Sequence, residues 1–177
     1  MSIEIAALTT ENYPGFAAHI RRHCRESGKD GYYFMPFIPV DPDQPKDVEL
    51  EKLSLPLNNP HWQRGFVAID MSSGRTIGHV DLKGERLKTI LHRCELGLGI
   101  EEAWRGQGLG KKLLQTAIEF ARSIQQLEWM DLSTFASNTK AQALYRSMGF
   151  EQTCVIREKF RINDVLIDDI GMTLRLK

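Results

Sequence analysis

A glycine-rich hexapeptide at residues 105–110 is the part of the chain whose residue types point most directly to chemistry. It reads Arg-Gly-Gln-Gly-Leu-Gly. An apolar stretch at 94–100 precedes it and predicts a strand, and apolar side chains recur at helical spacing over 109–124. A strand, a tight turn and a helix in this order direct unpaired backbone N–H groups and the positive end of the helix dipole at one point. Such a point binds a phosphate or pyrophosphate group.

The spacing of the glycines separates this loop from two common phosphate-binding loops. A P-loop requires a glycine five residues before its Gly-Lys pair and a Ser or Thr after the lysine. Arg105 and Lys112 occupy those two positions. A dinucleotide fingerprint requires Gly-x-Gly-x-x-Gly, and the third glycine is missing in every frame that begins at Gly97, Gly106 or Gly108. The spacing that remains is Arg-x-x-Gly-x-Gly.

A second block of residues lies downstream of the loop. Residues 129–134 predict a strand, and 138–150 follow with Asn, Ala, Leu-Tyr and Gly-Phe in that order. Together with Arg-x-x-Gly-x-Gly, this block resembles the two signature motifs of the GNAT superfamily of N-acetyltransferases. The tail at 168–172, Asp-Asp-Ile-Gly-Met, is similar to the branch that acetylates amino acids and small amines such as phosphinothricin. Residues 1 to about 90 match only in the order of their expected elements.

The resemblance implies acetyl-CoA as the donor co-substrate and no metal. Backbone N–H groups of the glycine loop would bind the pyrophosphate, where side chains at Gly108 and Gly110 would block its approach. The strand before the loop would pair with the pantetheine arm and offer one N–H to the thioester oxygen. Asn138 would hydrogen-bond the pantetheine, cap the following helix, or do both. The expected cofactor-binding residues are Leu98, Ile100, Arg105, Gly106, Gln107, Gly108, Gly110, Lys111 and Asn138.

Two residues are expected to transfer protons. Tyr145 corresponds to the family tyrosine that protonates the leaving thiolate, although its place in an apolar helical stripe also fits a core residue with no proton role. Glu95 lies on the strand before the loop and is the best candidate for the base that deprotonates the incoming ammonium ion. A solvated or ion-paired carboxylate is the competing interpretation of Glu95. His79 and Asp81 on the preceding strand are alternative bases, as is a water relay.

The same strand carries Gly97 and Gly99 on the face that it shares with Glu95. Two glycines on one face indicate a backbone that another group approaches closely. A weak strand with a bulge is the alternative.

Acceptor choice is expected to depend on the long connection between residues 27 and 60. Six of the seven prolines lie there, and loops of this length are usually functional or disordered. Its segment 30–37 holds four aromatic residues and a methionine, which would form either a cap on the core or one wall of an acceptor pocket. Tyr32, Tyr33 and Phe34 are the candidate substrate-binding residues.

The order of elements predicts an α/β fold, and the resemblance specifies it as a single-domain GNAT-like fold. This fold has a mixed, mostly antiparallel sheet of six to seven strands, flanking helices and a splayed central strand pair. Thr9 or Thr10 is expected to cap the first helix, which would run to about Cys24. The other strands are expected at 3–8, 65–71, 76–83, 153–161 and 165–174, with a short helix at 48–53.

The length and composition are those of an ordinary soluble protein with one domain over residues 1–177, which the resemblance implies is an N-acetyltransferase domain. Hydrophobic residues make up 42% and charged residues 26%. The 23 basic and 23 acidic side chains cancel, so no global field would attract nucleic acid. No apolar run approaches the roughly 18 residues of a membrane span. Cys24, Cys94 and Cys154 form no C-x-x-C pair, which favours a cytoplasmic location.

Two patterns on the first helix carry less weight. His19 and His23 lie four residues apart and could ligate a metal, but no third ligand follows at a suitable spacing, so no metal site is expected. Arg21, Arg22 and Arg25 are expected on a solvated face of the helix.

The sequence therefore favours an acetyl-CoA-dependent N-acetyltransferase that moves an acetyl group to the primary amine of a small molecule. Direct attack in a ternary complex is expected, because none of the cysteines falls at a motif position. A protein N-terminal or lysine acetyltransferase and a non-catalytic CoA-binding module are the alternatives. The sequence is also compatible with a homodimer.

Overall fold

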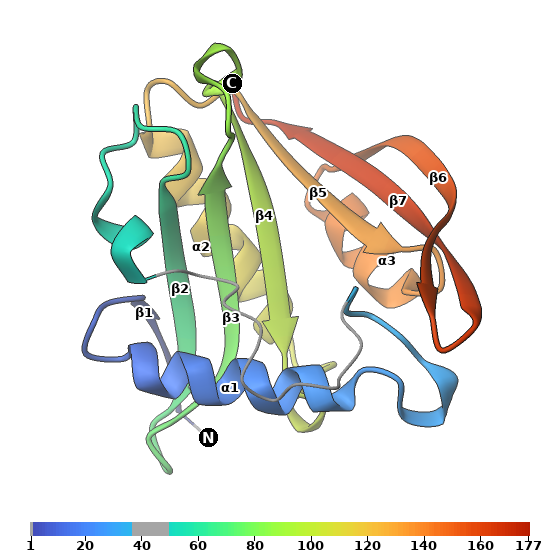
Figure 1. Ribbon diagram of the computed structural model, residues 1–177. Coiled ribbons are helices and arrows are strands. Elements are labelled where there is room, and N and C mark those ends of the chain that lie inside the picture. The colour runs from blue at the N-terminus through green and yellow to red at the C-terminus, as the bar shows by residue number, and fades with distance from the viewer. Residues whose placement is uncertain (1, 37–49) are drawn as a thin grey trace.

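The computed structural model describes residues 2–36 and 50–177. A seven-stranded sheet forms its centre, with the strand order β1-β2-β3-β4-β5-β7-β6 (Figure 1). The strands are β1 (Ile3–Ala7), β2 (Gln63–Asp70), β3 (Arg75–Gly84), β4 (Arg93–Ile100), β5 (Trp129–Phe135), β6 (Glu151–Ile162) and β7 (Val165–Arg175). The helices are α1 (Tyr13–Glu26), α2 (Leu109–Ser123) and α3 (Thr139–Ser147), with short 3₁₀ helices η1 (Lys29–Gly31), η2 (Leu50–Ser54), η3 (Lys88–Ile90) and η4 (Glu102–Trp104).

The sheet opens in its middle. β4 and β5 are the one parallel pair among the described strands, and their ladder holds only three residue pairs, from Arg93–Trp129 to Glu95–Asp131. Beyond these pairs the two strands diverge toward their carboxyl ends, while β4 stays paired with β3 and β5 with β7 (Figure 1). The result is a wedge between two antiparallel halves, which confirms the expected fold class and its splayed central strands.

Helices cover both faces of the sheet. α1 crosses in front of the first half, and α2 and α3 lie behind (Figure 1). The apolar stripe of α2 is buried against the sheet, as its 3.6-residue spacing predicts. The buried face of α1 is mixed, because Phe16 and Ile20 alternate there with His19 and His23. None of the helices in the described ranges combines the length and apolar character needed to span a membrane.

The first helix begins later than the sequence predicts. Asn12, and not Thr9 or Thr10, precedes the first helical residue. The Asn12 side chain accepts a hydrogen bond from Thr9 N (2.8 Å), so the two threonines belong to the turn that leads into the helix. Pro14 lies in the first turn, where its missing N–H costs least.

The β6–β7 hairpin closes the second half of the sheet. Asn163 and Asp164 both have positive φ (47° and 64°), as expected of this turn pair. A register shift interrupts β6 around Glu158, which also has positive φ (50°). The Glu158 N–H donates to Asp168 Oδ1 (2.7 Å), so this carboxylate holds the bulge in place.

Candidate active site

The glycine loop follows the carboxyl end of β4, at the mouth of the wedge. Gly106 and Gly108 have positive φ (75° and 80°), and Gly108 directly precedes α2. No side chain caps the N-terminus of α2, so its first N–H groups are available to an anion. A Cβ on Gly108 would meet nothing within 4 Å, whereas one on Gly110 would lie 3.1 Å from the side chain of Leu144. The positive φ therefore explains why residue 108 is a glycine. The close packing of α2 against α3 explains why residue 110 is a glycine.

Arg105 uses its side chain within the protein. Its Nε donates to the carbonyl of Ile100 (2.9 Å), and its terminal nitrogen pairs with Glu26 of α1. The guanidinium lies 4.8 Å from the centre of the Phe34 ring. The side chain thus ties the glycine loop to α1 and to the aromatic segment. The backbone N–H of Arg105 donates to the carbonyl of Glu102 (3.1 Å), so a contact of Arg105 with a phosphate stays a prediction.

Asn138 follows the carboxyl end of β5, so it lies across the mouth of the wedge from the glycine loop. Its Oδ1 accepts from Ala141 N (3.2 Å), which confirms the expected cap of α3. The same oxygen accepts a hydrogen bond from the Tyr32 hydroxyl (2.8 Å). Its contact with a pantetheine arm stays a prediction.

The three aromatic candidates for acceptor binding separate into two groups. The Tyr32 and Phe34 rings lie 6.0 Å apart and contact predicted cofactor residues, Asn138 and Arg105. Tyr33 is buried in a small core with Phe135, Ile162 and Ile167. Tyr33 therefore packs as a cap on this small core and also lines a cavity, and the role of all three residues in acceptor binding stays a prediction.

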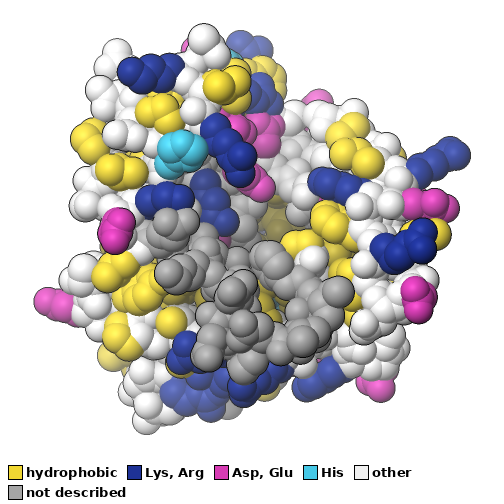
Figure 2. Space-filling view, in the orientation of Figure 1, with side chains coloured by type: hydrophobic (Ala, Val, Ile, Leu, Met, Phe, Trp, Pro, Cys, Tyr) yellow, Lys and Arg dark blue, Asp and Glu magenta, His cyan; other side chains and the backbone are white. Residues whose placement is uncertain are grey.

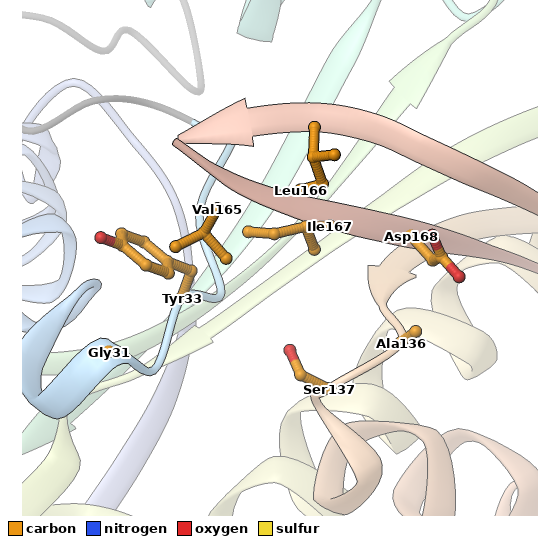
Figure 3. Close-up of a pocket in the computed structure, with 8 residues that line it drawn as sticks. All are labelled: Gly31, Tyr33, Ala136, Ser137, Val165, Leu166, Ile167 and Asp168. Atoms are coloured by element: carbon orange, nitrogen blue, oxygen red, sulfur yellow. The ribbon is translucent and has the colours of Figure 1, made fainter. Parts of the chain in front are cut away.

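A cavity of about 340 Å³ opens beside Tyr33 (Figure 3). The start of β7 contributes apolar side chains to it, and the turn between β5 and α3 forms its opposite wall. Its lining residues are Gly31, Tyr33, Ala136, Ser137, Val165, Leu166, Ile167 and Asp168. Ala136 and Ser137 directly precede Asn138 in the chain, and none of the lining residues comes from β4 or from the glycine loop.

Tyr145 is buried in the main core on α3, with 6% of its surface exposed. Its ring centroid lies 5.8 Å from that of Phe150. Burial raises the pKa of its hydroxyl, which therefore stays protonated near neutral pH. This state suits both a proton donor and a core tyrosine, and the catalytic role stays a prediction.

Glu95 lies at the closed end of the wedge, in the last residue pair of the β4–β5 ladder. It is exposed and stands opposite Lys83 of β3. Figure 2 shows acidic side chains along the edge of the hollow between the two halves of the sheet. The position allows contact with solvent and an incoming amine, and its role as base stays a prediction.

Two glycines on β4 lie beneath polar side chains of β3. Gly97 is opposite Asp81, and Gly99 is opposite His79. A Cβ on Gly97 would lie 2.5 Å from Asp81 Oδ1, and one on Gly99 would lie 2.4 Å from His79 Cε1. The predicted close approach is confirmed. Asp81 approaches Gly97, and both His79 and His23 approach Gly99. The bulge alternative is wrong, because the β3–β4 ladder keeps a continuous register.

A buried hydrogen-bond chain links these residues to α1. His19 Nε2 lies 2.9 Å from His79 Nδ1, and His19 Nδ1 lies 3.0 Å from Glu101 Oε1. Arg22 Nε also donates to Glu101 (2.9 Å), so the prediction that Arg22 lies on a solvated face is wrong. Within residues 2–36 and 50–177, no group of three or more His, Cys, Asp or Glu side chains is arranged to hold a metal ion.

The sequence did not predict this chain of contacts. A signal for it existed in the first helix, where His19 and His23 share the apolar face of Phe16 and Ile20. Histidines on a buried helical face require polar partners. The spacing along the helix does not say that the partner is His79, sixty residues away.

Comparison with known proteins shows which family has this arrangement of strands and motifs. The model of the acetyltransferase (GNAT) family matches residues 30–150. The chain belongs to the GNAT family. This membership confirms the resemblance that the two motifs indicate, and it supports acetyl-CoA-dependent N-acetylation as the activity.

Related GNAT proteins differ in how much of their length is shared. An uncharacterized N-acetyltransferase of Bacillus subtilis, YycN, is 25% identical over 90% of this chain and 99% of its own. The N-alpha-acetyltransferase RimI of Mycobacterium tuberculosis is 33% identical over 37% of this chain, a match that spans only 39% of that protein. An acetyltransferase of the GNAT family from Streptococcus pneumoniae has a TM-score of 0.81 at 22% identity, covering 99% and 100% of the two chains.

A further GNAT structure contains the expected co-substrate. It is a phosphinothricin acetyltransferase from Sinorhizobium meliloti in complex with acetyl-CoA. Its TM-score is 0.78 at 18% identity, covering 99% of this chain and 89% of that one. At this identity the likeness establishes the fold.

Proposed function

We propose that the chain transfers the acetyl group of acetyl-CoA to the primary amine of a small molecule. The wedge between β4 and β5 carries this proposal. Because the strands pair only from Arg93 to Glu95 on β4, they are farthest apart where the glycine loop and Asn138 follow them. A long, thin ligand with a phosphate at one end fits such a site, with its phosphate at the N-terminus of α2.

In the proposed reaction, each residue around the wedge would have a separate role. One backbone N–H from Leu98 to Ile100 would stabilise the oxyanion of the tetrahedral intermediate, a contribution typically of about 3 kcal/mol. Glu95 would take a proton from the attacking amine, and Tyr145 would give one to the leaving thiolate. The Asn138 amide nitrogen would donate to the pantetheine, because its oxygen already accepts from Tyr32 and Ala141.

The cysteines support direct attack of the amine on the thioester. Burial raises the pKa of the Cys94 thiol to about 12, so it is a poor nucleophile near neutral pH. Cys154 is exposed on β6, in the edge strand of the second half, and Cys24 lies on α1. An acyl-enzyme intermediate would need a reactive thiol at the wedge.

A thiol-release screen tests the proposal. Purified protein and acetyl-CoA are mixed with amino acids, polyamines, aminoglycosides and peptides with free N-termini, and release of the CoA thiol is followed. We expect release with a small primary amine. Release with peptides alone would favour a protein acetyltransferase, and CoA binding without release on any amine would favour a non-catalytic binding module.

A pair of substitutions at Tyr32 tests the acceptor wall. We expect Tyr32→Ala to raise the acceptor KM by about tenfold, the effect of losing about 1.4 kcal/mol of ring contact, with a smaller change in the acetyl-CoA KM. Tyr32→Phe keeps the ring and removes only the hydrogen bond to Asn138, so its acceptor KM should stay near wild type. If the Phe variant instead matches the Ala variant and raises the acetyl-CoA KM, Tyr32 acts through Asn138 and not on the acceptor.

A further inference from the structure

The buried row formed by Asp81, His79, His19 and Glu101 has no part in the division of roles above. Its members come from β3, from α1 and from the residue that follows β4. The side chains of Asp81 and His79 are only 3% and 6% exposed, and that of His19 is fully buried. Buried ionisable groups in a row are costly unless each has a partner, so their arrangement constrains where the protons are.

The charge states follow from the surroundings. Burial lowers the pKa of His79 well below its ordinary value, and burial also lowers that of His19, so both rings are neutral near pH 7. Burial alone would raise the pKa of Glu101, but hydrogen bonds from His19 and Arg22 bring it below its ordinary value. Glu101 is therefore a carboxylate hydrogen-bonded to the neutral imidazole of His19, which in turn contacts the neutral imidazole of His79.

These charges assign the hydrogens along the row. The Glu101 carboxylate only accepts, so His19 carries its hydrogen on Nδ1, and His19 Nε2 is left as an acceptor. His79 must then donate from Nδ1 to His19 Nε2. The remaining nitrogen, His79 Nε2, has a free lone pair and faces Asp81 Oδ1 at 3.6 Å. The other Asp81 oxygen, Oδ2, lies 3.4 Å from Lys83 Nζ. A proton between His79 Nε2 and Asp81 Oδ1 would therefore have a basic atom on each side.

This pair of acceptors lies against the strand that would hold the reacting thioester. Asp81 lies over Gly97 and His79 over Gly99, within the part of β4 that has left β5. An acceptor that arrives as an ammonium ion must lose one proton before it attacks and another from the tetrahedral intermediate. Glu95, two residues before Gly97, would take the second of them, so the proton of the ammonium ion needs another acceptor.

We propose that the Asp81–His79 pair accepts a proton from the acceptor amine, and that His19 and Glu101 are positioning residues that fix His79 with Nε2 as the basic atom. This inference rests on the proposed N-acetyltransferase function. One proton leaves the amine nitrogen, which keeps the electron pair, and the proton comes to rest on His79 Nε2 between the imidazole and the Asp81 carboxylate. The pair then returns the proton to water, and no oxidant or further reactant is needed.

The groups that surround His79 set its basicity. His19 and His23 face it from α1, together with the Phe16 ring. Asp81 and Lys83 face it from β3, and the backbone of Gly99 lies beneath it. Any positive charge on His19, His23 or Lys83 lowers the pKa of His79, and the Asp81 carboxylate is the one negative neighbour among these groups.

The test compares His79→Gln and Asp81→Asn with wild type, using the best amine from the thiol-release screen. At about pH 7 we expect kcat/KM for the amine to fall by about 100-fold, the low end of the usual range for a proton-transfer group. At about pH 9.5 the deficit should shrink several-fold, because more of the amine arrives already neutral. Calorimetry should give an unchanged acetyl-CoA Kd.

His23→Gln is the matched control. His23 lies one turn from His19 on the same buried face, and its ring is stacked on that of His19 at 5.7 Å, but it is not part of the hydrogen-bond chain. This control should stay within about threefold of wild type, less than one tenfold step of 1.4 kcal/mol, at both pH values. If His79→Gln does not fold, Asp81→Asn alone decides the result.

Three results would overturn the inference. If kcat/KM of His79→Gln and Asp81→Asn stays as close to wild type as that of His23→Gln, the pair has no role in proton transfer. An equal loss at both pH values, with a lower melting temperature, assigns the row to structure alone. A wild-type protein that acetylates no primary amine removes the proposed function, and the inference with it, whereas the first two results leave that function intact.

Discussion

Gly108→Asp should weaken acetyl-CoA binding by about a thousandfold and leave the fold intact. The substitution places a carboxylate at the first N–H groups of α2, where the pyrophosphate is expected. Two unit charges about 4 Å apart repel by about 4 kcal/mol at the effective dielectric of a protein surface, and each 1.4 kcal/mol is a tenfold change in Kd. Calorimetric titration with acetyl-CoA measures the loss.

Gly108→Asn separates charge from backbone conformation. Gly108 has φ of 80°, a region that Asn and Asp tolerate better than other residues with a side chain, and a Cβ there meets no neighbour within 4 Å. The Asn variant should therefore melt near the Asp variant but retain much more affinity. A folded Asp variant with wild-type affinity would show that the pyrophosphate binds elsewhere.

Tyr145→Phe should lower kcat by about 10- to 1000-fold if the hydroxyl protonates the leaving thiolate, within or below the usual range for a proton-transfer group. The ring keeps its packing against Phe150, so only the hydroxyl is removed. Steady-state kinetics with a saturating amine and saturating acetyl-CoA provide the measurement.

Two controls accompany the Tyr145 variant. Its melting temperature should stay near wild type, since the substitution leaves no cavity in the core. Its acetyl-CoA Kd should also be unchanged, because the hydroxyl acts after binding. An unaltered kcat with both controls satisfied would make Tyr145 a core residue only.

The second half of the fold was readable from local sequence. Its turns are marked by residues that tolerate positive φ, Gly106 and Gly108 in the loop and Asn163 with Asp164 in the hairpin, and all four adopt such angles. The alternation and helical spacing between these turns then gave each element its type. The separation of β4 and β5 could not be predicted in this way. The family resemblance implied it, because no local sequence pattern indicates where two parallel strands separate.

Contacts between elements that are distant in the chain could not be predicted from the sequence. The row from Glu101 through His19 to His79 joins three segments, and each of its residues looks like an isolated polar side chain within its own segment. Arg22 shows the same limit, since helical spacing alone gave no reason to exclude it from the solvated face. Which side chains meet across the sheet depends on how α1 crosses β3 and β4, and that angle is a property of the packed core.

The short ladder between β4 and β5 gives the sheet two internal edges. Unpaired backbone N–H and C=O groups on a strand edge invite pairing with a strand from another molecule, and proteins usually blunt or cover such edges. Here the edges face each other and are joined at one end by the pairs from Arg93 to Glu95. To pair with both edges, a strand from another molecule would have to lie about 4.8 Å from each of them. The two edges converge toward the closed end, where there is no room for such a strand. The narrowing gap therefore guards against aggregation while it leaves backbone groups free for a thinner ligand.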